Sequence, residues 1–380
     1  MSQSSPVTRA PLAEEDLEAF AAELDDILRR ASEALGDPDI RYLRSLVRTQ
    51  RALEILGRCL LQFGRSRLTG ATGAVTLAAA KTLDNLEIGH NVLHGQYDWA
   101  KDPHLNSRSF EWDVAVSARL WRYQHNFVHH TYTNVYGRDE NLSTGPLRVS
   151  TPQPWRRHHV LGPLLLLIMA PLSEWVLALQ TAAESCQGNA PEDLRATRED
   201  VIREAVRKAA RQAAKDLVLF PLLSGRRARR TFLANTTALL LRNVWIFVVA
   251  LISHYPEGLT VYDEEVLENE TRGQWYARQV SGTANISGGR LLHILSGHHT
   301  QHIEHHLFPS LPASRYQEVA SQVREVCERH GVPYATASLP SQLASALRHL
   351  FALSLPPRTA TCRESRTSWL LIWSSRISKN

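Results

Sequence analysis

The feature that most constrains this 380-residue chain is a histidine-rich run, residues 296–309, with five histidines within nine residues. If the run is helical, four of the imidazoles share one face: His298, His302, His305 and His306. His299 is then expected to point elsewhere. A neutral imidazole is the commonest protein ligand for transition metals such as iron and zinc. The run therefore predicts a metal site, with the role of His298 left open.

Two further histidine clusters lie upstream of this run. His90 and His94 are four residues apart, and His125 and His129 repeat the spacing with His130 added. A single pair says little, because a buried histidine with satisfied hydrogen bonds is the commoner explanation. Three clusters in one chain supply eight well-spaced imidazoles, which is twice what a tetrahedral zinc site needs. The sequence therefore predicts two metal ions.

The segments between the clusters decide whether the clusters can meet. No apolar run of a dozen residues separates the first two clusters, so these lie on the same side of any membrane. Two segments before the third cluster are apolar enough to span one, residues 160–181 and 231–253. Two crossings return the third cluster to the side of the first two. Arg242, inside the second segment, is expected to face protein or to reach toward the interface.

Charge argues against the simplest version of this topology. Residues 182–230 carry eleven Lys or Arg residues and would lie outside, against the positive-inside tendency. In the alternative scheme, Pro163 and Pro171 make residues 160–181 a broken element that does not cross. Residues 217–253 then form a hairpin about a turn at 224–227. Either scheme keeps the three clusters together.

The composition limits the class of partner and the compartment. A net charge of +5 and a pI near 9.1 fit a nucleic-acid binder or a protein whose basic loops contact anionic lipid. The apolar segments favour lipid, and no nucleic-acid partner is predicted. The four cysteines form no C-x-x-C pair, so a disulfide framework, a zinc ribbon and an iron–sulfur cluster all lack support. A reducing cytosolic face is the simplest location.

At its three clusters the chain resembles the membrane fatty acid desaturases, whose boxes read HxxxH, HxxHH or HxxxHH, and (H or Q)xxHH. The likeness extends to Gly-His-Asn-Val-Leu-His-Gly-Gln-Tyr-Asp-Trp at 89–99 and Arg-Gly-Gln-Trp-Tyr-Ala-Arg-Gln at 272–279, and it covers about residues 80–350. The pattern looks like the bacterial branch related to linoleoyl-CoA desaturases, although that branch more often has Gln at 302 and Asn at 298.

The resemblance implies two irons held by histidines on the cytosolic face of a helical membrane domain. It also adds a histidine at the end of the last membrane helix, a place that His254 occupies. The implied ligands are nine: His90, His94, His125, His129, His130, His254, His302, His305 and His306. Carboxylates such as Glu304, Asp84 and Glu87 are expected to orient ring nitrogens.

The implied reaction is the O2-dependent introduction of a double bond into an acyl chain linked to CoA, a carrier or a lipid. Hydrogen removal from an unactivated methylene requires an oxidant stronger than any side chain, so the protein must supply a metal centre. The chain has no Gly-rich dinucleotide fingerprint, cysteine cluster or His-Pro-Gly-Gly haem signature. A separate electron donor is therefore expected, a ferredoxin, a cytochrome or a flavin reductase.

Three other functions compete with this interpretation. An acyl or alkane hydroxylase needs the same site, and a non-catalytic histidine-rich membrane protein would store or transport metal. A soluble ferritin-like oxidase needs two Glu-x-x-His motifs, and only Glu87–His90 fits.

The predicted fold class is all-α, an integral membrane helical domain with a cytosolic helical cap that carries the histidine-bound di-iron site. Residues 1–50 are expected to form a tail and an amphipathic helix, residues 51–350 the desaturase membrane domain, and residues 351–380 an unassigned tail. Helical periodicity is also present at 193–215, 315–330 and 339–353.

Overall fold

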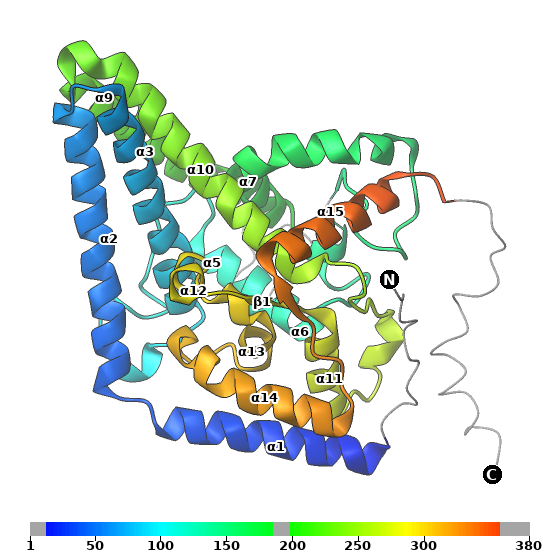
Figure 1. Cartoon of the computed structure of the whole chain (residues 1–380). Helices are drawn as coiled ribbons and strands as arrows, with labels where there is room; N and C mark the ends of the chain where they lie inside the picture. The colour runs from blue at the N-terminus through cyan, green and yellow to red at the C-terminus, as the bar shows by residue number, and fades with distance from the viewer. Residues whose placement is uncertain (1–12, 144, 185–197, 358–380) are drawn as a thin grey trace, which may run out of the picture.

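The computed structural model describes residues 13–143, 145–184 and 198–357, and these are almost entirely helical (Figure 1). Two strands of three residues each, β1 (Asn285–Ser287) and β2 (Thr336–Ser338), pair in parallel. The all-α expectation is confirmed. Most of the predicted C-terminal tail and part of the linker after residue 184 lie outside the described residues.

An amphipathic helix, α1 (Glu14–Glu33), covers the edge of the molecule at the bottom of Figure 1. Its buried face includes Phe20, Leu24 and Ile27, which pack in one core with α14 (Tyr316–His330) and α11 (Arg272–Gly282). The apolar periodicity of the N-terminal segment and of residues 315–330 predicted α1 and α14. The predicted domain boundary at residue 50 falls inside the next helix, α2 (Asp37–Phe63).

Two helical hairpins meet at their turns at the upper left of Figure 1. The first joins α2 to α3 (Arg67–Thr82), and the second joins α9 (Phe220–Leu223) to α10 (Ala228–His254). Small residues such as Ala74, Ala78 and Ala238 line their contact and let the backbones approach closely. The carbonyl oxygens of Gln62 and Gly64 in the first turn accept hydrogen bonds from Arg227 and Arg230 of the second, at 2.7 and 2.9 Å.

The helix α7 (Gly162–Glu184) crosses α10 and extends to the right in Figure 1. It is continuous through Pro171, so the expectation of a broken element is wrong. The Pro171 carbonyl accepts a hydrogen bond from the side-chain amide of Asn243 on α10, at 2.9 Å, which links the two helices where they cross. As expected, Arg242 faces protein: it is 2% exposed and pairs with Glu174 of α7.

The histidine clusters lie on short helical segments below the hairpins. These are the π-helix η1 (Leu83–His90), α4 (Asn91–Leu93), α5 (Ala118–Trp121), the π-helix η3 (Arg122–His129), α6 (His130–Tyr132), α12 (Arg290–Leu295), η9 (His299–Gln301) and α13 (His302–Leu307). The remaining elements are α8 (Arg198–Ala213), the π-helix η6 (Ala214–Leu219), α15 (Leu339–Ser354), and the 3-10 turns η2 (Asp98–Ala100), η4 (Glu140–Ser143), η5 (Arg157–Leu161), η7 (Gly225–Arg227), η8 (Glu264–Leu267) and η10 (Ala313–Arg315).

Candidate metal centre

All nine predicted histidines lie together at the end of the hairpins opposite to their turns. His90 is the last residue of the π-helix that continues α3, and His94 follows α4. In the second cluster His125 and His129 lie on the π-helix η3, and His130 begins α6. His254 is the last residue of α10, and the third cluster lies on α13. Short π-helical segments are rare and occur frequently at functional sites. Histidine spacing in the sequence did not predict them.

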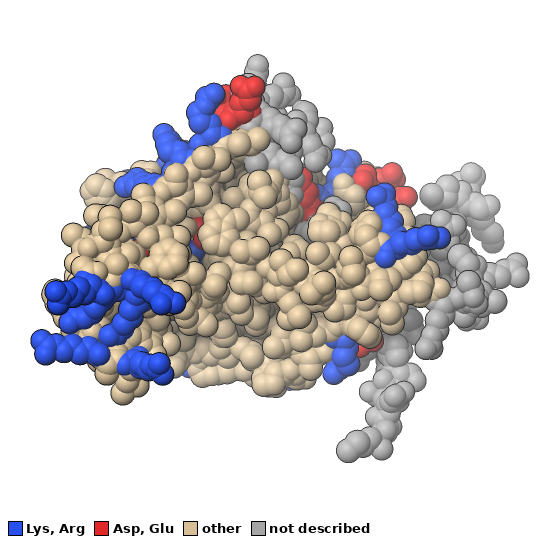
Figure 2. Space-filling view, turned by 90° about the horizontal axis from the view of Figure 1, so that it is seen from above, with Lys and Arg blue, Asp and Glu red and all other residues tan. Residues whose placement is uncertain are grey.

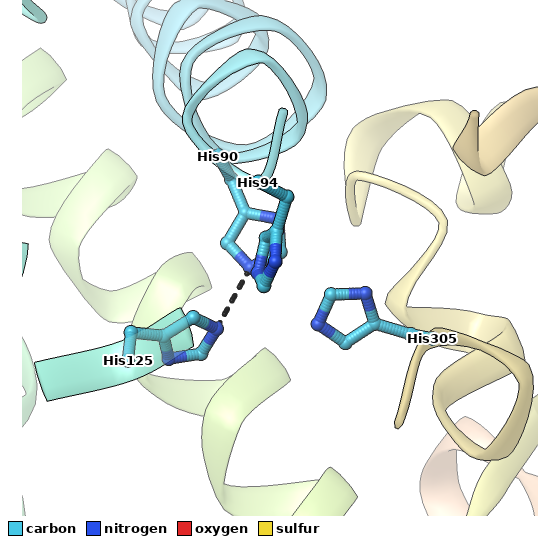
Figure 3. A group of neighbouring side chains, drawn as sticks. All are labelled: His90, His94, His125 and His305. Atoms are coloured by element: carbon cyan, nitrogen blue, oxygen red, sulfur yellow. Dashed lines mark hydrogen bonds between the residues drawn. The ribbon is translucent and has the colours of Figure 1, made fainter. Parts of the chain in front are cut away.

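Four histidines form the first group, shown in Figure 3: His90, His94, His125 and His305. One ring nitrogen of each lies within 4.8 Å of those of the other three. The Nε2 atoms of His90 and His125 are 3.2 Å apart. Trp121 stacks on the His125 ring with centroids 4.4 Å apart and planes 17° from parallel, which fixes the orientation of that ring.

The second group lies beside the first. His129, His254 and His306 each direct one ring nitrogen to within 4.8 Å of the others. His302 joins them, because its Nε2 lies 2.8 Å from that of His254 and 3.2 Å from that of His306. His130 lies between the groups, stacked on His306 with centroids 4.3 Å apart, and neither of its ring nitrogens has a hydrogen-bond partner.

The distances between these nitrogens suit a shared cation. Two nitrogens bound to one metal at about 2.1 Å are about 3.0 Å apart at a right angle and about 3.4 Å apart at the tetrahedral angle. Burial lowers the pKa of His125, His130, His302, His305 and His306 well below its ordinary value, so these imidazoles are neutral. Neutral rings that face each other with lone pairs repel unless a cation lies between them. The residues present therefore fit two metal ions.

Hydrogen bonds to the opposite ring nitrogen hold several of these imidazoles in the tautomer that a metal needs. The Nδ1 atoms of His90 and His306 lie 3.1 Å from the side-chain oxygens of Asn91 and Gln279. An amide oxygen only accepts, so the proton stays on Nδ1 and the lone pair on Nε2. Gln279 belongs to the motif at 272–279, and its side chain also donates to the backbone of His130. The contact of Gln279 with His306 was not predicted from the sequence.

The carboxylate that contacts one of the nine histidines is Asp139, which the sequence did not indicate. It is 1% exposed, and one oxygen lies 3.1 Å from Nδ1 of His129. Its oxygens also accept from the backbone N–H groups of Asn134 and Asn141, at 2.8 and 3.1 Å. Three hydrogen bonds to one buried carboxylate fix its position. Asp139 lies ten residues beyond His129 in an irregular turn, where no periodic spacing points to it.

The three carboxylates expected in this role lie elsewhere. Glu304 accepts from Asn285 and from the Tyr334 hydroxyl, which anchors α13 to the short sheet, and burial raises the pKa of Glu304 to about 7. Glu87 does bind a histidine, but this is His298 and not one of the nine. Asp84 makes no hydrogen bond to a histidine within the described part of the chain.

His298 and His299 differ from their expected positions because the run is not a continuous helix. The backbone is left-handed at Gly297 (φ 65°) and His298 (φ 59°), and the helix begins only at His302. Nδ1 of His298 lies 2.9 Å from a Glu87 oxygen, outside the two groups. His299 is 7% exposed and its ring centroid lies 4.3 Å from that of His90. The expectation that His299 points away is therefore wrong.

The fold and this site define a class: an all-helical protein that buries two groups of converging, neutral imidazoles suited to a pair of metal ions. Neither group found in the described residues contains a carboxylate, unlike the glutamate-rich sites of ferritin-like oxidases.

Comparison with known proteins narrows this class to one family. The model of the fatty acid desaturase family matches residues 66–338. An NADPH-dependent stearoyl-CoA 9-desaturase from Mycobacterium tuberculosis is 43% identical over 355 residues, which cover 92% of this chain and 82% of the relative. An sn-1 linoleoyl-lipid 6-desaturase from Arthrospira platensis is 25% identical over 296 residues, 76% of this chain and 78% of the relative.

The chain belongs to the fatty acid desaturase family. It is accordingly an oxidoreductase that desaturates acyl chains.

Proposed function

We propose that the protein is a membrane-bound desaturase of saturated acyl-CoA that holds two irons and uses O2 as co-substrate. The proposed ligands are His90, His94, His125, His129, His130, His254, His302, His305 and His306. The observation that carries the proposal is the spacing of 2.8–3.2 Å between Nε2 atoms of facing imidazoles in both groups. When bound, the iron pair supplies the activation of O2 that oxidation of an unactivated methylene requires.

The chain's own residues prepare this centre by orientation and burial. Asn91, Asp139 and Gln279 hold Nδ1 of a histidine each, so that Nε2 is free for the metal. Seven of the nine histidines are buried, which excludes bulk water from the reacting atoms. An all-imidazole set of ligands suits iron. Because these ligands are neutral, they do not offset the positive charge of the ion.

The substrate proposal rests on the Mycobacterium tuberculosis relative, which is named for stearoyl-CoA, and on an apolar groove of about 360 Å³. Trp175, Ala209 and Leu239 are among its lining residues. Trp175 and Ala209 also pack against the buried cluster that contains Leu93, the neighbour of His94. An apolar groove whose lining packs against this buried cluster suits a hydrocarbon chain.

Electrons are proposed to come from a separate protein. The relative's name includes NADPH dependence, whereas this sequence carries no Gly-rich dinucleotide fingerprint. A flavin reductase would therefore oxidise NADPH, and the two electrons needed for each double bond would reach this protein from it directly or one at a time through a ferredoxin or a cytochrome.

The membrane placement is proposed from the apolar surfaces of the helices. Two helical stretches are long and apolar enough to cross a bilayer, Arg157–Thr181 and Gly225–His254. Figure 2 shows the upper face of the molecule dominated by residues that are neither acidic nor basic, with Lys and Arg gathered at its left end. The joined hairpin turns lie at this end in Figure 1, and Arg65, Arg67, Arg226 and Arg229 are exposed there.

The arrangement of the hairpins favours the scheme in which residues 217–253 form a membrane hairpin. Both hairpins would enter the bilayer with their turns at the far side, and His254 would return to the near side with the other ligands. In this scheme α7, whose most apolar stretch is only 17% buried, lies in the interface and does not cross. We propose that the near side, with the histidine cluster, is cytoplasmic, within the domain of residues 51–350.

The test is turnover combined with metal analysis. Protein purified in detergent is expected to hold two irons per chain and to convert labelled stearoyl-CoA to an unsaturated product only with O2 and a reductase system. His305→Ala should lose both iron and product. His330→Ala is the matched control, since that histidine pairs with Glu23 far from the cluster. Zinc in place of iron, or two bound irons with no O2-dependent product, would refute the proposal, and a hydroxylated acyl product would assign the protein to the hydroxylases.

A further inference from the structure

His299 lies within the histidine cluster but is not among the nine proposed ligands. Its ring centroid is 4.3 Å from that of His90 and 5.2 Å from those of His302 and His305. His90 and His305 belong to the first group, whereas His302 joins the second. His299 therefore contacts both groups. His130, which is one of the nine proposed ligands, does the same.

A hydrogen bond fixes the tautomer of His299. Its Nδ1 lies 2.7 Å from the backbone carbonyl oxygen of Ser296. A carbonyl oxygen only accepts, so the proton is on Nδ1 and Nε2 carries the lone pair. No hydrogen bond found among the described residues involves this Nε2. The same arrangement, with Nδ1 held by an acceptor, is present at His90 and His306.

The backbone before His299 explains why two adjacent histidines have opposite environments. Gly297 and His298 both adopt the left-handed conformation, and a Cβ at Gly297 would lie 2.8 Å from the Leu86 backbone on η1. This close approach directs the His298 side chain to Glu87, while the next residue, His299, enters the cluster. The chain thus offers a matched pair: one histidine beside the proposed metals and one outside them.

We propose that His299 is a tenth imidazole of the metal centre and binds metal through Nε2. This inference rests on the proposed function, because it requires that the other nine histidines hold iron. It adds a ligand on the side of the cluster formed by His90, His302 and His305. One coordination position fewer then remains for O2 and solvent.

The decisive variant is His299→Asn. The asparagine amide places an N–H near the position of Nδ1 and can retain the hydrogen bond to Ser296, but it has no group at the position of Nε2. His298→Asn is the matched control, because its ring contacts Glu87 and not the proposed ligands. Each protein is loaded with ferrous iron, and the iron per chain, the resistance of the iron to a chelator, the Mössbauer spectrum and the iron X-ray absorption are measured.

We expect His299→Asn to keep the thermal midpoint of the iron-free wild type, to release iron to the chelator at least fivefold more readily, and to show altered Mössbauer and absorption spectra. His298→Asn should keep the wild-type spectra. A His299→Asn protein with wild-type spectra and iron retention would overturn the proposal. If that variant does not fold, added imidazole should restore the wild-type spectrum to His299→Gly, and failure to do so would also overturn it. Absence of iron from the wild type would instead refute the proposed function.

Discussion

The buried carboxylate of Asp139 allows a quantitative test of how the second histidine group is held. In Asp139→Asn the side chain keeps one acceptor oxygen, although the wild-type carboxylate accepts from two backbone N–H groups and from His129. At least one donor then faces an amide N–H, and an unsatisfied buried donor costs about 1–3 kcal/mol. The imidazole also loses the charged acceptor that keeps its proton on Nδ1.

Loss of such a supporting partner typically weakens metal binding by about 10–100-fold. This corresponds to about 1.4–2.7 kcal/mol of binding free energy. We therefore expect Asp139→Asn to retain iron that is released to a ferrous chelator at a 10–100-fold lower chelator concentration than in the wild type. The thermal midpoint of the iron-free protein should fall as well, since the loss of backbone hydrogen bonds does not depend on metal.

The assay is equilibrium competition between the iron-loaded protein and the chelator, with melting of the iron-free protein followed separately by circular dichroism. Glu264→Gln is the matched control, because Glu264 is a half-exposed carboxylate that pairs with Arg138 in the same region. It should change neither quantity. Iron retention by Asp139→Asn within threefold of the wild type would refute the assigned role of this carboxylate.

Three further substitutions test other parts of the structure. Gly297→Ala should lower the thermal midpoint and the iron content together. The left-handed backbone costs a residue with a Cβ about 1–2 kcal/mol, and the new methyl group would meet the backbone of η1. A variant with wild-type iron content and thermal midpoint would contradict the tight docking of this turn. Glu174→Gln should destabilise the protein by about 3–5 kcal/mol in denaturant unfolding, because it leaves Arg242 charged and buried without its partner. The double variant Glu174→Met with Arg242→Met should recover much of this loss. Equal effects of the single and double variants would contradict the pairing. The ion pair with Arg315 outweighs burial and holds the pKa of Asp39 below its ordinary value, so its stabilisation is present above the unfolded pKa near 3.8 and is lost as the pH falls through the lower folded pKa. Asp39→Asn should therefore be less stable than the wild type at pH 7, by about 1.5–3 kcal/mol for a charged hydrogen bond, and the difference should shrink as the pH falls below 3.8 when iron-free protein is melted. A difference that stays constant as the pH falls would contradict the assignment.

Periodicity and histidine spacing predicted the parts of the structure that local sequence determines. The amphipathic patterns of α1, α14 and α15 and the apolar runs of α7 and α10 all correspond to helices. The nine histidines also lie together, as their pattern implied, although their binding of iron stays a prediction.

What the sequence did not predict depends on contacts between distant segments. Gln279 and Asp139 reach the cluster from a separate helix and an irregular turn, so no spacing rule relates them to the histidines they hold. His299 enters the cluster and His298 lies outside it, the reverse of the helical expectation. The cause is two consecutive left-handed residues, Gly297 and His298, which a helical pattern cannot represent. Pro171 predicts a break when the local sequence is considered alone, but α7 continues through it and packs against α10, where Asn243 donates to the Pro171 carbonyl.

The two π-helices, which contain His90 of the first histidine cluster and His125 and His129 of the second, set the direction in which these histidines point. Each is eight residues long and continues directly from an α-helix whose packing is fixed elsewhere, α3 for one and α5 for the other. If the backbone there adopted α-helical hydrogen bonding without losing a residue, every histidine beyond that point would turn by about 100° about the helix axis, away from its partners. In these two stretches the register of the chain, and not only the identity of its residues, determines whether a metal centre can form.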